Sequence, residues 1–370
     1  MDASDHELLI CCDVMNGKSN RLNSSGIALL ITVAILSVLV AVSLEMNRRG
    51  RSAATRALIE QNRTTLSAMA ASGVQAAMAL LIRDKADSET DSVQEPWANP
   101  DIVQAVVSEL AFEAGELSVV IQDEQGKIQV NALVQGAEGR QYNESQHLLW
   151  DRFLRIMHSR ISPKEPFEPD TVICAMKDWM DSKDDDALSC MNGADSDYYE
   201  GLTPPYPCRN GPIPHIGDMM RIKGMTAQLF YGLPNERGIS DYITAYRGEG
   251  ALPAGFSGKI NINTAEQLVL AAMLPSGKED MAQLLLDYRG EMSDTKYIHD
   301  LSSPSWYKQV PGLQGVLIDP RLITLSSDLF RIRACARMDH VSVMATALVH
   351  RENDPITRKY ICKILTWLVE

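Results

Sequence analysis

The chain has 370 residues, enough for two or three domains. Its 35 Lys and Arg stand against 48 Asp and Glu, a formal net charge of -13. This balance argues against a nucleic-acid-binding protein, because phosphate contacts need clustered cations. Apolar residues make up 45% of the chain and charged residues 22%, so wholesale disorder is excluded as well.

An apolar run from Ile27 to Leu44 contains no charged side chain. As a helix it would be about 27 Å long, which is enough to cross a hydrocarbon core. A secretory signal would be shorter and would end at a small-residue cleavage site. This run instead continues into a helical pattern without a proline. We therefore expect one long helix over residues 27–84, with a transmembrane part at 27–44 and an amphipathic remainder.

Basic residues flank this run on both sides. Two precede it, and four follow it within its first turns beyond the apolar part. By the positive-inside rule, this excess would place the rest of the chain in the cytoplasm. A plain membrane anchor with a cytoplasmic body is therefore one alternative that the sequence leaves open.

The segment just before the run is polar from Lys18 to Gly26 and then turns apolar at Ile27. This arrangement resembles the leader of type IV pilin-like proteins. The resemblance implies that residues 1–26 are a leader and that a prepilin peptidase cuts between Gly26 and Ile27, with methylation of the new N-terminus. Such a leader is long for the family, so a start at Met15 is an alternative.

Ile31 occupies the fifth position after this cleavage point, where most pilin-like subunits carry glutamate. In that family the glutamate is thought to pair with the N-terminal amine of a neighbouring subunit, and a carboxylate in lipid is costly without a partner. A subunit with nothing above it in a filament needs no such carboxylate. In this respect the chain resembles the minor pseudopilin K family of type II secretion systems, the subunit at the pseudopilus tip.

Several segments of the body show the alternation typical of β-strands. Residues 117–123 and 127–133, with a short glycine-containing connection between them, predict a hairpin that resembles one in the K family. Three further strands are predicted near the end of the chain, in residues 322–337, 341–350 and 359–367. Strands from both ends imply one antiparallel sheet that is interrupted by an insertion.

The resemblance therefore implies an α+β, pilin-like fold, in which the long N-terminal helix packs on an antiparallel sheet. A large, mostly helical insertion would interrupt that sheet. The parts expected after the helix are residues 102–139 as the first part of the sheet domain, 140–318 as the insertion and 319–370 as the strands that complete the sheet.

Within the insertion, residues 259–274 and 281–289 resemble helix-hairpin-helix (SAM-like) units. We expect Asn263 or Thr264 to cap the helix that follows. Units of this kind that bind DNA need a glycine turn and nearby cations. The turn over residues 274–280 bears a proline and is acidic, with two acids, so we expect a structural role and no nucleic acid.

Eight carboxylates fall within residues 178–200, flanked by Trp179 and Tyr198. Most acidic runs are solvated charges, but aromatic side chains at both ends would keep these carboxylates together. Calcium prefers clustered oxygens, and K-family subunits carry calcium in a similar loop. The resemblance thus implies calcium as a cofactor. The candidate ligands are Asp181, Asp184, Asp186, Asp195 and Asp197.

Seven cysteines occur, of which two would leave with the leader. An oxidising compartment would permit disulfides, although their connectivity cannot be read from a sequence. The open possibilities are Cys190 with Cys208, which bracket the acidic run, and Cys335 with Cys362, which lie on predicted strands. Cys174 would then be left over.

No catalytic motif accompanies these features. The chain has no zinc-protease HExxH, no GxSxG elbow, no phosphate-binding loop and no dinucleotide-binding glycine motif, and its seven histidines are scattered. We therefore expect a protein that is not an enzyme.

Taken with the resemblance, these features imply a minor pseudopilin at the pseudopilus tip, which nucleates assembly and supports export of folded proteins. It would be a single-pass protein of the bacterial inner membrane with most of its chain in the periplasm. Its partners would be the I- and J-type minor pseudopilins, the major pseudopilin, the prepilin peptidase and the inner-membrane secretion platform, with the secretin or an exported protein as further candidates. The alternative function is a minor pilin of a type IV pilus or competence system.

Overall fold

The computed structural model describes residues 24–136, 139, 141–162, 164, 166–182, 191–246 and 256–370. The chain divides into two units, residues 1–61 and residues 62–370. Of the predicted leader, all but the last three residues lie outside the described part of the chain.

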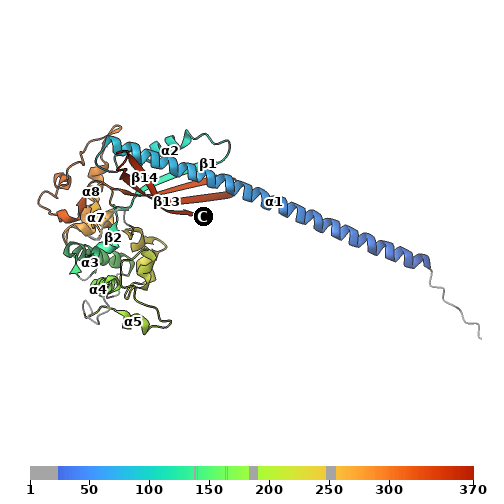
Figure 1. The fold of residues 1–370 in the computed structure, drawn as a ribbon, viewed down its shortest axis with the longest axis horizontal. Coiled ribbons are helices and arrows are strands. Elements are labelled where there is room, and N and C mark those ends of the chain that lie inside the picture. Colours follow the sequence, from blue (N-terminus) through green and yellow to red (C-terminus); the bar gives the residue numbers. More distant parts are fainter. Residues whose placement is uncertain are drawn as a thin grey trace, which may run out of the picture. The chain divides into compact units, whose positions relative to one another are not determined.

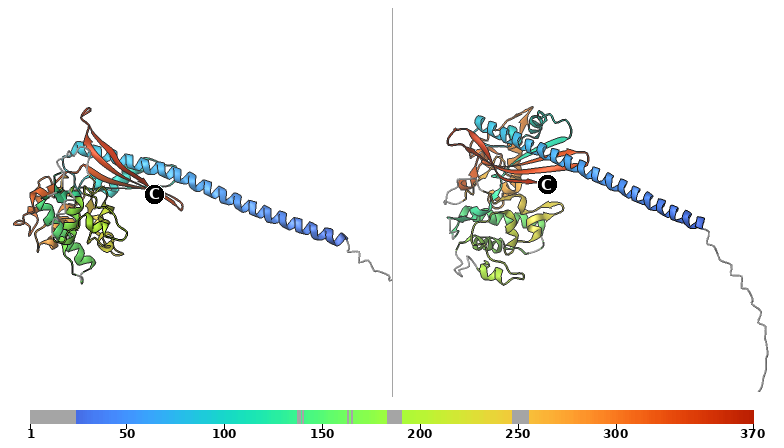
Figure 2. Two further views of the ribbon diagram at one scale, coloured as in Figure 1. Left: turned by 60° about the horizontal axis from the view of Figure 1, so that its bottom comes forward. Right: turned by 45° about the vertical axis from the view of Figure 1, so that its right-hand side comes forward.

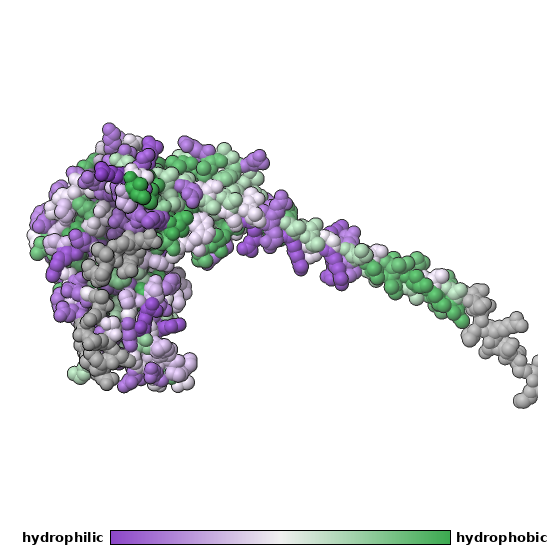
Figure 3. Space-filling model, viewed as in Figure 1, coloured by the Kyte–Doolittle hydropathy of each residue, from purple (hydrophilic) through white to green (hydrophobic). Residues whose placement is uncertain are grey.

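Helix α1 (Ser24–Asp87) is continuous over 64 residues and includes the whole predicted helix. Its first part is long and apolar enough to cross a membrane, and no other helix among the described residues meets that test. The apolar side chains there are exposed, Leu30 by 71% and Ile31 by 53%. Figure 3 shows them as a continuous hydrophobic stretch. The expected transmembrane part thus coincides with side chains that the rest of the chain leaves uncovered.

A four-stranded antiparallel sheet lies against the second part of α1 (Figure 1), with the strand order β1-β12-β13-β14. The strands are β1 (Glu116–Asp123), β12 (Leu329–Met338), β13 (Val341–Asn353) and β14 (Tyr360–Val369). Val119 pairs with Ala334, and Ile332 pairs with Ala347. These side chains form one apolar core with Leu66 of α1. The expected packing of a long helix on an antiparallel sheet is confirmed.

A glycine allows α1 to approach the sheet closely. A Cβ atom on Gly73 would lie 2.9 Å from Val119 Cγ2, 3.1 Å from Leu117 Cδ2 and 3.3 Å from Ala334 Cβ. Because glycine lacks that atom, the helix backbone can sit directly on the side chains of β1 and β12.

The segment between α1 and β1 closes the edge of this core. It contains η1 (Pro96–Ala98) and α2 (Pro100–Ser108). Asn99 caps α2, since its side chain accepts hydrogen bonds from the backbone N–H groups of Asp101 at 2.9 Å and Ile102 at 3.3 Å. Trp97 is 3% exposed and packs edge-on against the ring of Phe330, so this segment belongs to the core of the sheet.

The predicted hairpin over residues 117–133 is wrong. β1 pairs with β12 along its whole length. The chain then leaves the sheet: β2 (Ile128–Gln129) pairs in parallel with β7 (Ile243–Thr244), and η2 (Val130–Leu133) follows. The apolar side chains of β2 and η2 enter the core of the insertion. Alternation predicts a strand in such a segment, but it does not identify the partner strand.

The insertion forms a second apolar core that runs from Ile128 to Ile323. This core begins before residue 140 and ends beyond residue 318. At one end β2 and η2 contribute to it, and at the other η7 (Pro320–Leu322) and β11 (Ile323–Thr324) do. In both views of Figure 2 the insertion, coloured green to orange, lies beside the sheet. Trp150, Trp179 and Trp306 are among its fully buried side chains.

Short helices dominate the insertion. The α-helices are α3 (Glu144–Ile161), α4 (Pro169–Met180), α5 (Ser196–Glu200), α6 (Ala227–Tyr231), α7 (Gln267–Met273) and α8 (Ala282–Gly290). The 3-10 turns are η3 (Ile216–Arg221), η4 (Ile239–Asp241), η5 (Glu279–Met281), η6 (Trp306–Gln309) and η7 (Pro320–Leu322). The remaining strands are pairs of two residues each: β3 (Val134–Gln135) with β4 (Gln141–Tyr142), β5 (Gly232–Leu233) with β6 (Glu236–Arg237), β9 (Met292–Ser293) with β10 (Lys296–Tyr297), and β8 (Ile260–Asn261) with β11 (Ile323–Thr324).

Candidate functional site

Arg351 lies at the centre of a buried polar cluster where α1, the segment after it and the sheet meet. It belongs to β13 and is 1% exposed. Its guanidinium donates to the Asp91 carboxylate, to the Ser327 carbonyl oxygen at 2.8 Å and to the Leu81 carbonyl oxygen at 3.0 Å. The ring of Phe330 lies 4.7 Å from Arg351 Cζ. One side chain thus fastens the end of α1 to the sheet.

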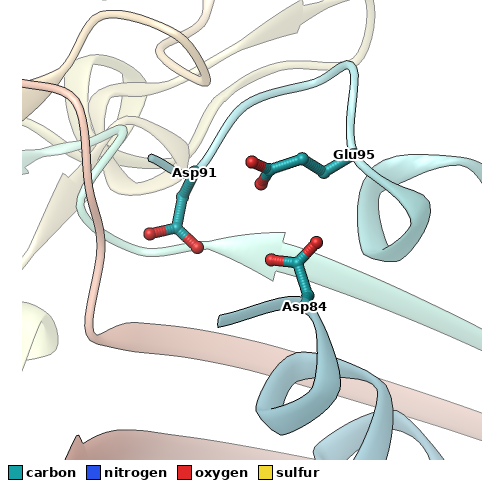
Figure 4. Close-up of side chains that lie close together, drawn as sticks. All are labelled: Asp84, Asp91 and Glu95. Carbon is teal, nitrogen blue, oxygen red and sulfur yellow. The ribbon is translucent and has the colours of Figure 1, made fainter. Parts of the chain in front are cut away.

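Three carboxylates point toward one another in this cluster (Figure 4). Asp84, Asp91 and Glu95 each offer an oxygen within 4.8 Å of the others. Glu95 accepts a hydrogen bond from Trp97 Nε1 at 2.9 Å. Asp84 Oδ2 has no hydrogen-bond donor among the described residues and lies 3.8 Å from Arg351 Nη1.

The charges of the cluster do not balance. Arg351 and Lys85 are its cations, and Lys85 Nζ lies 3.5 Å from Asp91 Oδ2. One of the three carboxylates therefore lacks a matching charge. Burial, followed by the charges of Glu95 and Asp91, raises the pKa of Asp84 to about 7. A metal ion would have to share this position with the Arg351 guanidinium, so the geometry favours an ion-pair cluster that binds a proton near neutral pH.

A second polar network joins this cluster to the insertion. Asn261 Nδ2 donates to the Asp91 carbonyl oxygen at 2.9 Å, to Ser327 Oγ at 2.9 Å and to Asp123 Oδ2 at 3.1 Å. Thr264 Oγ1 donates to the same Asp123 oxygen at 2.5 Å. Ser327 Oγ donates to it as well. Burial raises the pKa of Asp123 to about 6, against the opposing effect of the Ser327 and Thr264 hydroxyl donors. The network holds β8 of the insertion at the point where β1 ends.

The predicted helix cap is therefore wrong. α7 begins after Glu266, and no side chain caps it. Asn263 is fully buried, where its Oδ1 accepts from Trp306 Nε1 at 2.8 Å and its Nδ2 donates to the Leu301 carbonyl oxygen at 3.3 Å. Thr264 bonds to the sheet domain instead. The sequence signal was present in residues 259–264, but polar residues before a helix suggest a cap, and their distant partners are invisible in the sequence.

The described ends of the acidic run are held together. Asp178 is 4% exposed, and its Oδ2 accepts a hydrogen bond from the backbone N–H of Ala194 at 2.9 Å. Trp179 packs edge-on against Tyr199 with ring centroids 4.9 Å apart. Aromatic side chains thus anchor both ends of the run, although Tyr199 rather than Tyr198 is the buried one.

The five candidate calcium ligands are placed only in part. Asp184 and Asp186 lie outside the described residues. Asp181 directly follows α4, and Asp195 caps the N-terminus of α5. In the part of the run that the structure describes, Asp181, Asp195 and Asp197 do not form a group with all ligand atoms within 4.8 Å of one another. The calcium site stays a prediction.

The two predicted disulfides do not form in this structure. Cys335 and Cys362 are both thiols, because they lie on β12 and β14 and β13 separates these strands. Cys208 is also a thiol, so it does not bridge to Cys190, which itself lies outside the described residues. Cys174, which the prediction left over, is disulfide-bonded.

Gly26 and Ile27 lie in the first turn of α1. Both are exposed, and nothing lies within 4 Å of the position that a Gly26 Cβ would occupy. Ile31 follows one turn later on the same exposed helix. Cleavage between Gly26 and Ile27 stays a prediction, since residues 1–23 lie outside the described part of the chain.

Comparison with known proteins agrees with this architecture. The family model described as "Type II secretion system (T2SS), protein K" matches residues 126–235. Type II secretion system protein K of Aeromonas hydrophila is 27% identical over 305 residues, covering 79% of this chain and 84% of that protein. Over most of its length the chain is therefore similar to type II secretion system protein K. Protein K of Klebsiella pneumoniae is 26% identical over 300 residues, covering 78% of this chain and 80% of that protein.

A solved structure shares the fold of this chain. It is the crystal structure of the GspK-GspI-GspJ complex from enterotoxigenic Escherichia coli. The match has a TM-score of 0.59 at 16% identity and covers 85% of this chain and 99% of the solved one. At this identity the likeness concerns the fold alone.

Proposed function

We propose that this chain is a minor pseudopilin at the tip of the type II secretion pseudopilus, where it nucleates assembly and supports export of folded proteins. The observation that carries the proposal is the combination of a pilin-like helix and sheet with an insertion that has a core of its own. Ile31, apolar where most pilin-like subunits carry glutamate, supports a position with no subunit above it.

The assembly steps follow from the order of the parts. Prepilin peptidase would free Ile27 and methylate it. The apolar part of α1 would hold the subunit in the inner membrane, with the body in the periplasm, and the amphipathic part would pack against helices of other pseudopilins. The insertion, with its helix-hairpin-helix-like α7 and α8, would then block the addition of a subunit above it.

The partners we propose follow from this position. The solved relative is named as a complex with GspI and GspJ, which supports I- and J-type minor pseudopilins as neighbours. The major pseudopilin, the prepilin peptidase and the inner-membrane platform would act during assembly. The secretin or an exported protein would meet the tip.

N-terminal sequencing tests the proposal. We expect the full chain, co-expressed with a prepilin peptidase and extracted from membranes, to begin at N-methylated Ile27. A Gly26→Ala variant should keep its leader, and its intact mass would show this directly. A chain that begins at Met1 or Met15 despite active peptidase would contradict the assembly steps and restore the plain membrane anchor.

We also propose that the acidic run binds calcium through oxygens of Asp181, Asp184, Asp186, Asp195 and Asp197. The support is that Asp178 and the aromatic pair hold the two described ends of the run close together. An ion there would offset the repulsion between the carboxylates. Chelator should therefore lower the melting temperature of the full chain, and added calcium should restore it. Identical melting curves with and without chelator would contradict the site.

A further inference from the structure

A cleft lies between the sheet and the insertion, on the face of the sheet that α1 does not cover. Along β12, Ile332 and Ala334 face α1, so the alternate residues Arg331 and Arg333 face the other way. The cleft has a volume of about 270 Å³. Its charged and polar lining is Gln122, Glu124, Lys127, His215, Arg237, Ser240, Asp241, Thr244, Tyr246, Arg331 and Arg333.

Two of the cations are engaged with one acid on the floor of the cleft. Glu124 is 1% exposed and accepts from Arg331 Nε at 2.6 Å and from Lys127 Nζ at 2.9 Å. Burial alone would raise the pKa of Glu124, but Lys127 and Arg331 hold it at about 2. Glu124 is therefore ionised, and this group keeps one positive charge.

On the insertion side, the positive charge of Arg237 is already matched by carboxylates. It donates to Asp241 at 2.9 Å and forms two bonds to Glu266, at 2.6 and 3.2 Å. The geometry is forked, so both Glu266 oxygens are used. Two acids for one guanidinium leave this side with one negative charge.

Arg333 remains. Its side chain is exposed and makes no hydrogen bond or ion pair with any side chain or backbone group among the described residues. His215 supplies a second donor beside it in the lining: its Nδ1 accepts from the backbone N–H of Gly217 at 3.0 Å, so in the neutral ring the proton is on Nε2. The Gln122 side chain, on β1, can donate as well. Among the described residues of the cleft and their ion-pair partners, four cations meet three carboxylates, which leaves one positive charge.

We propose that this cleft binds a carboxylate, and that the carboxylate is an acidic side chain of a protein partner. One unmatched positive charge suits a monoanion, whereas a phosphate carries close to two negative charges near neutral pH. The volume lies below the range of about 300–1,000 Å³ that is typical for small-molecule pockets, so the cleft suits a side chain better than a nucleotide or cofactor. Arg333 would grip the carboxylate with its forked donors. The site does not depend on the place of the chain in a filament.

Thermal shifts of the full chain in detergent, at constant ionic strength, test the proposal. The probes are the peptides acetyl-Gly-Glu-Gly-amide and acetyl-Gly-Gln-Gly-amide, acetate and inorganic phosphate. We expect the Glu peptide to raise the melting temperature with a dissociation constant in the millimolar range, and the Gln peptide to have no effect. Arg333→Gln should weaken the Glu peptide about tenfold or more, because it loses a charge-assisted pair.

Arg337→Gln is the matched control. Arg337 lies on the same strand and the same face, is also exposed, and does not line the cleft. Arg337→Gln should leave the melting-temperature shift caused by the Glu peptide unchanged, and Arg333→Lys should keep part of that shift. Equal shifts in wild type and Arg333→Gln, or no shift with any probe, would overturn the site. If phosphate raises the melting temperature more than the Glu peptide does, the cleft does not prefer a carboxylate. If acetate raises it as much as the Glu peptide does, the cleft does not recognise a protein side chain in particular.

Discussion

Asp84 lies at the end of α1 with 6% of its surface exposed and with burial as the main cause of its raised pKa, about 7. For a carboxyl of this kind, the folded protein holds more protons than the unfolded chain at every pH between the two pKa values. Stability therefore falls as the pH rises from about 4 to about 7 and levels off above. The total fall amounts to at most about 4 kcal/mol, at 1.36 kcal/mol per pKa unit.

Asp84→Asn should remove most of this dependence. At a pH of about 5 the variant and the wild type should melt at similar temperatures, because asparagine resembles a protonated aspartate. At a pH of about 8 the variant should melt several degrees higher, because no buried carboxylate has to ionise. Thermal denaturation of the full chain in detergent across this range measures the difference.

Asp91→Asn is the control for this cluster. It takes the charged partner from the buried Arg351, so we expect a loss of about 3 kcal/mol at both ends of the pH range. If Asp84→Asn also melts lower than wild type at the alkaline end, Asp84 is an obligatory ion-pair partner and the proton-binding interpretation is wrong.

At the scale of elements, α1 meets the sheet through a position without a side chain. The 2.9 Å between a hypothetical Gly73 Cβ and Val119 Cγ2 leaves no room for a branched residue. Gly73→Val should therefore lower stability by about 1–3 kcal/mol, through displacement of the helix from β1 and β12. The melting temperature of the full chain would show it.

Gly50 provides the comparison on the same helix. Nothing lies within 4 Å of the position of its Cβ. Gly50→Ala should leave the melting temperature unchanged or slightly higher, because alanine has the better helix propensity by about 1 kcal/mol. If Gly73→Val were equally harmless, the close approach of helix and sheet would not be needed for stability.

At the scale of the whole molecule, the two apolar cores have separate tasks. The core under α1 stabilises the helix-and-sheet body. The core of the insertion stabilises the part that we propose prevents a further subunit from adding above this one. The networks around Arg351 and Asn261 connect the two parts. The insertion is thus fixed to the sheet by polar contacts, and its position is set at the ends of β1 and β12.

The proposed tip position predicts the effect of one substitution in the apolar part of α1. In a tip subunit, Ile31→Glu would place a carboxylate in lipid without a neighbouring amine, at about 2.5–3.5 kcal/mol. We expect reduced membrane insertion or reduced secretion in a strain that depends on this chain, whereas Ile31→Leu should behave as wild type. Full secretion by Ile31→Glu would mean that an amine is within reach, which contradicts a tip position.

Much of the fold could be predicted from the sequence because its signals are local. The uncharged run at residues 27–44 and the proline-free continuation define α1 by composition alone. The alternation in residues 341–350 and 359–367 defines β13 and β14, since a half-buried strand needs it. The polar residues at 259–264 were correctly placed before a helix, although Asn263 and Thr264 were assigned the wrong contacts.

Only the tertiary structure decided which distant residues meet. Residues 127–133 read as a strand next to β1, but their partner is 115 residues further along the chain, at β7. The sequence allows a disulfide between Cys335 and Cys362, but β13 lies between the strands that carry them. The carboxylates of Asp84, Asp91 and Glu95 form a cluster only because Arg351 of β13 is folded against them. Hydrophobic periodicity determines the type of an element and its buried face, whereas the choice of partner depends on packing energies between segments far apart in the chain, which no local pattern encodes.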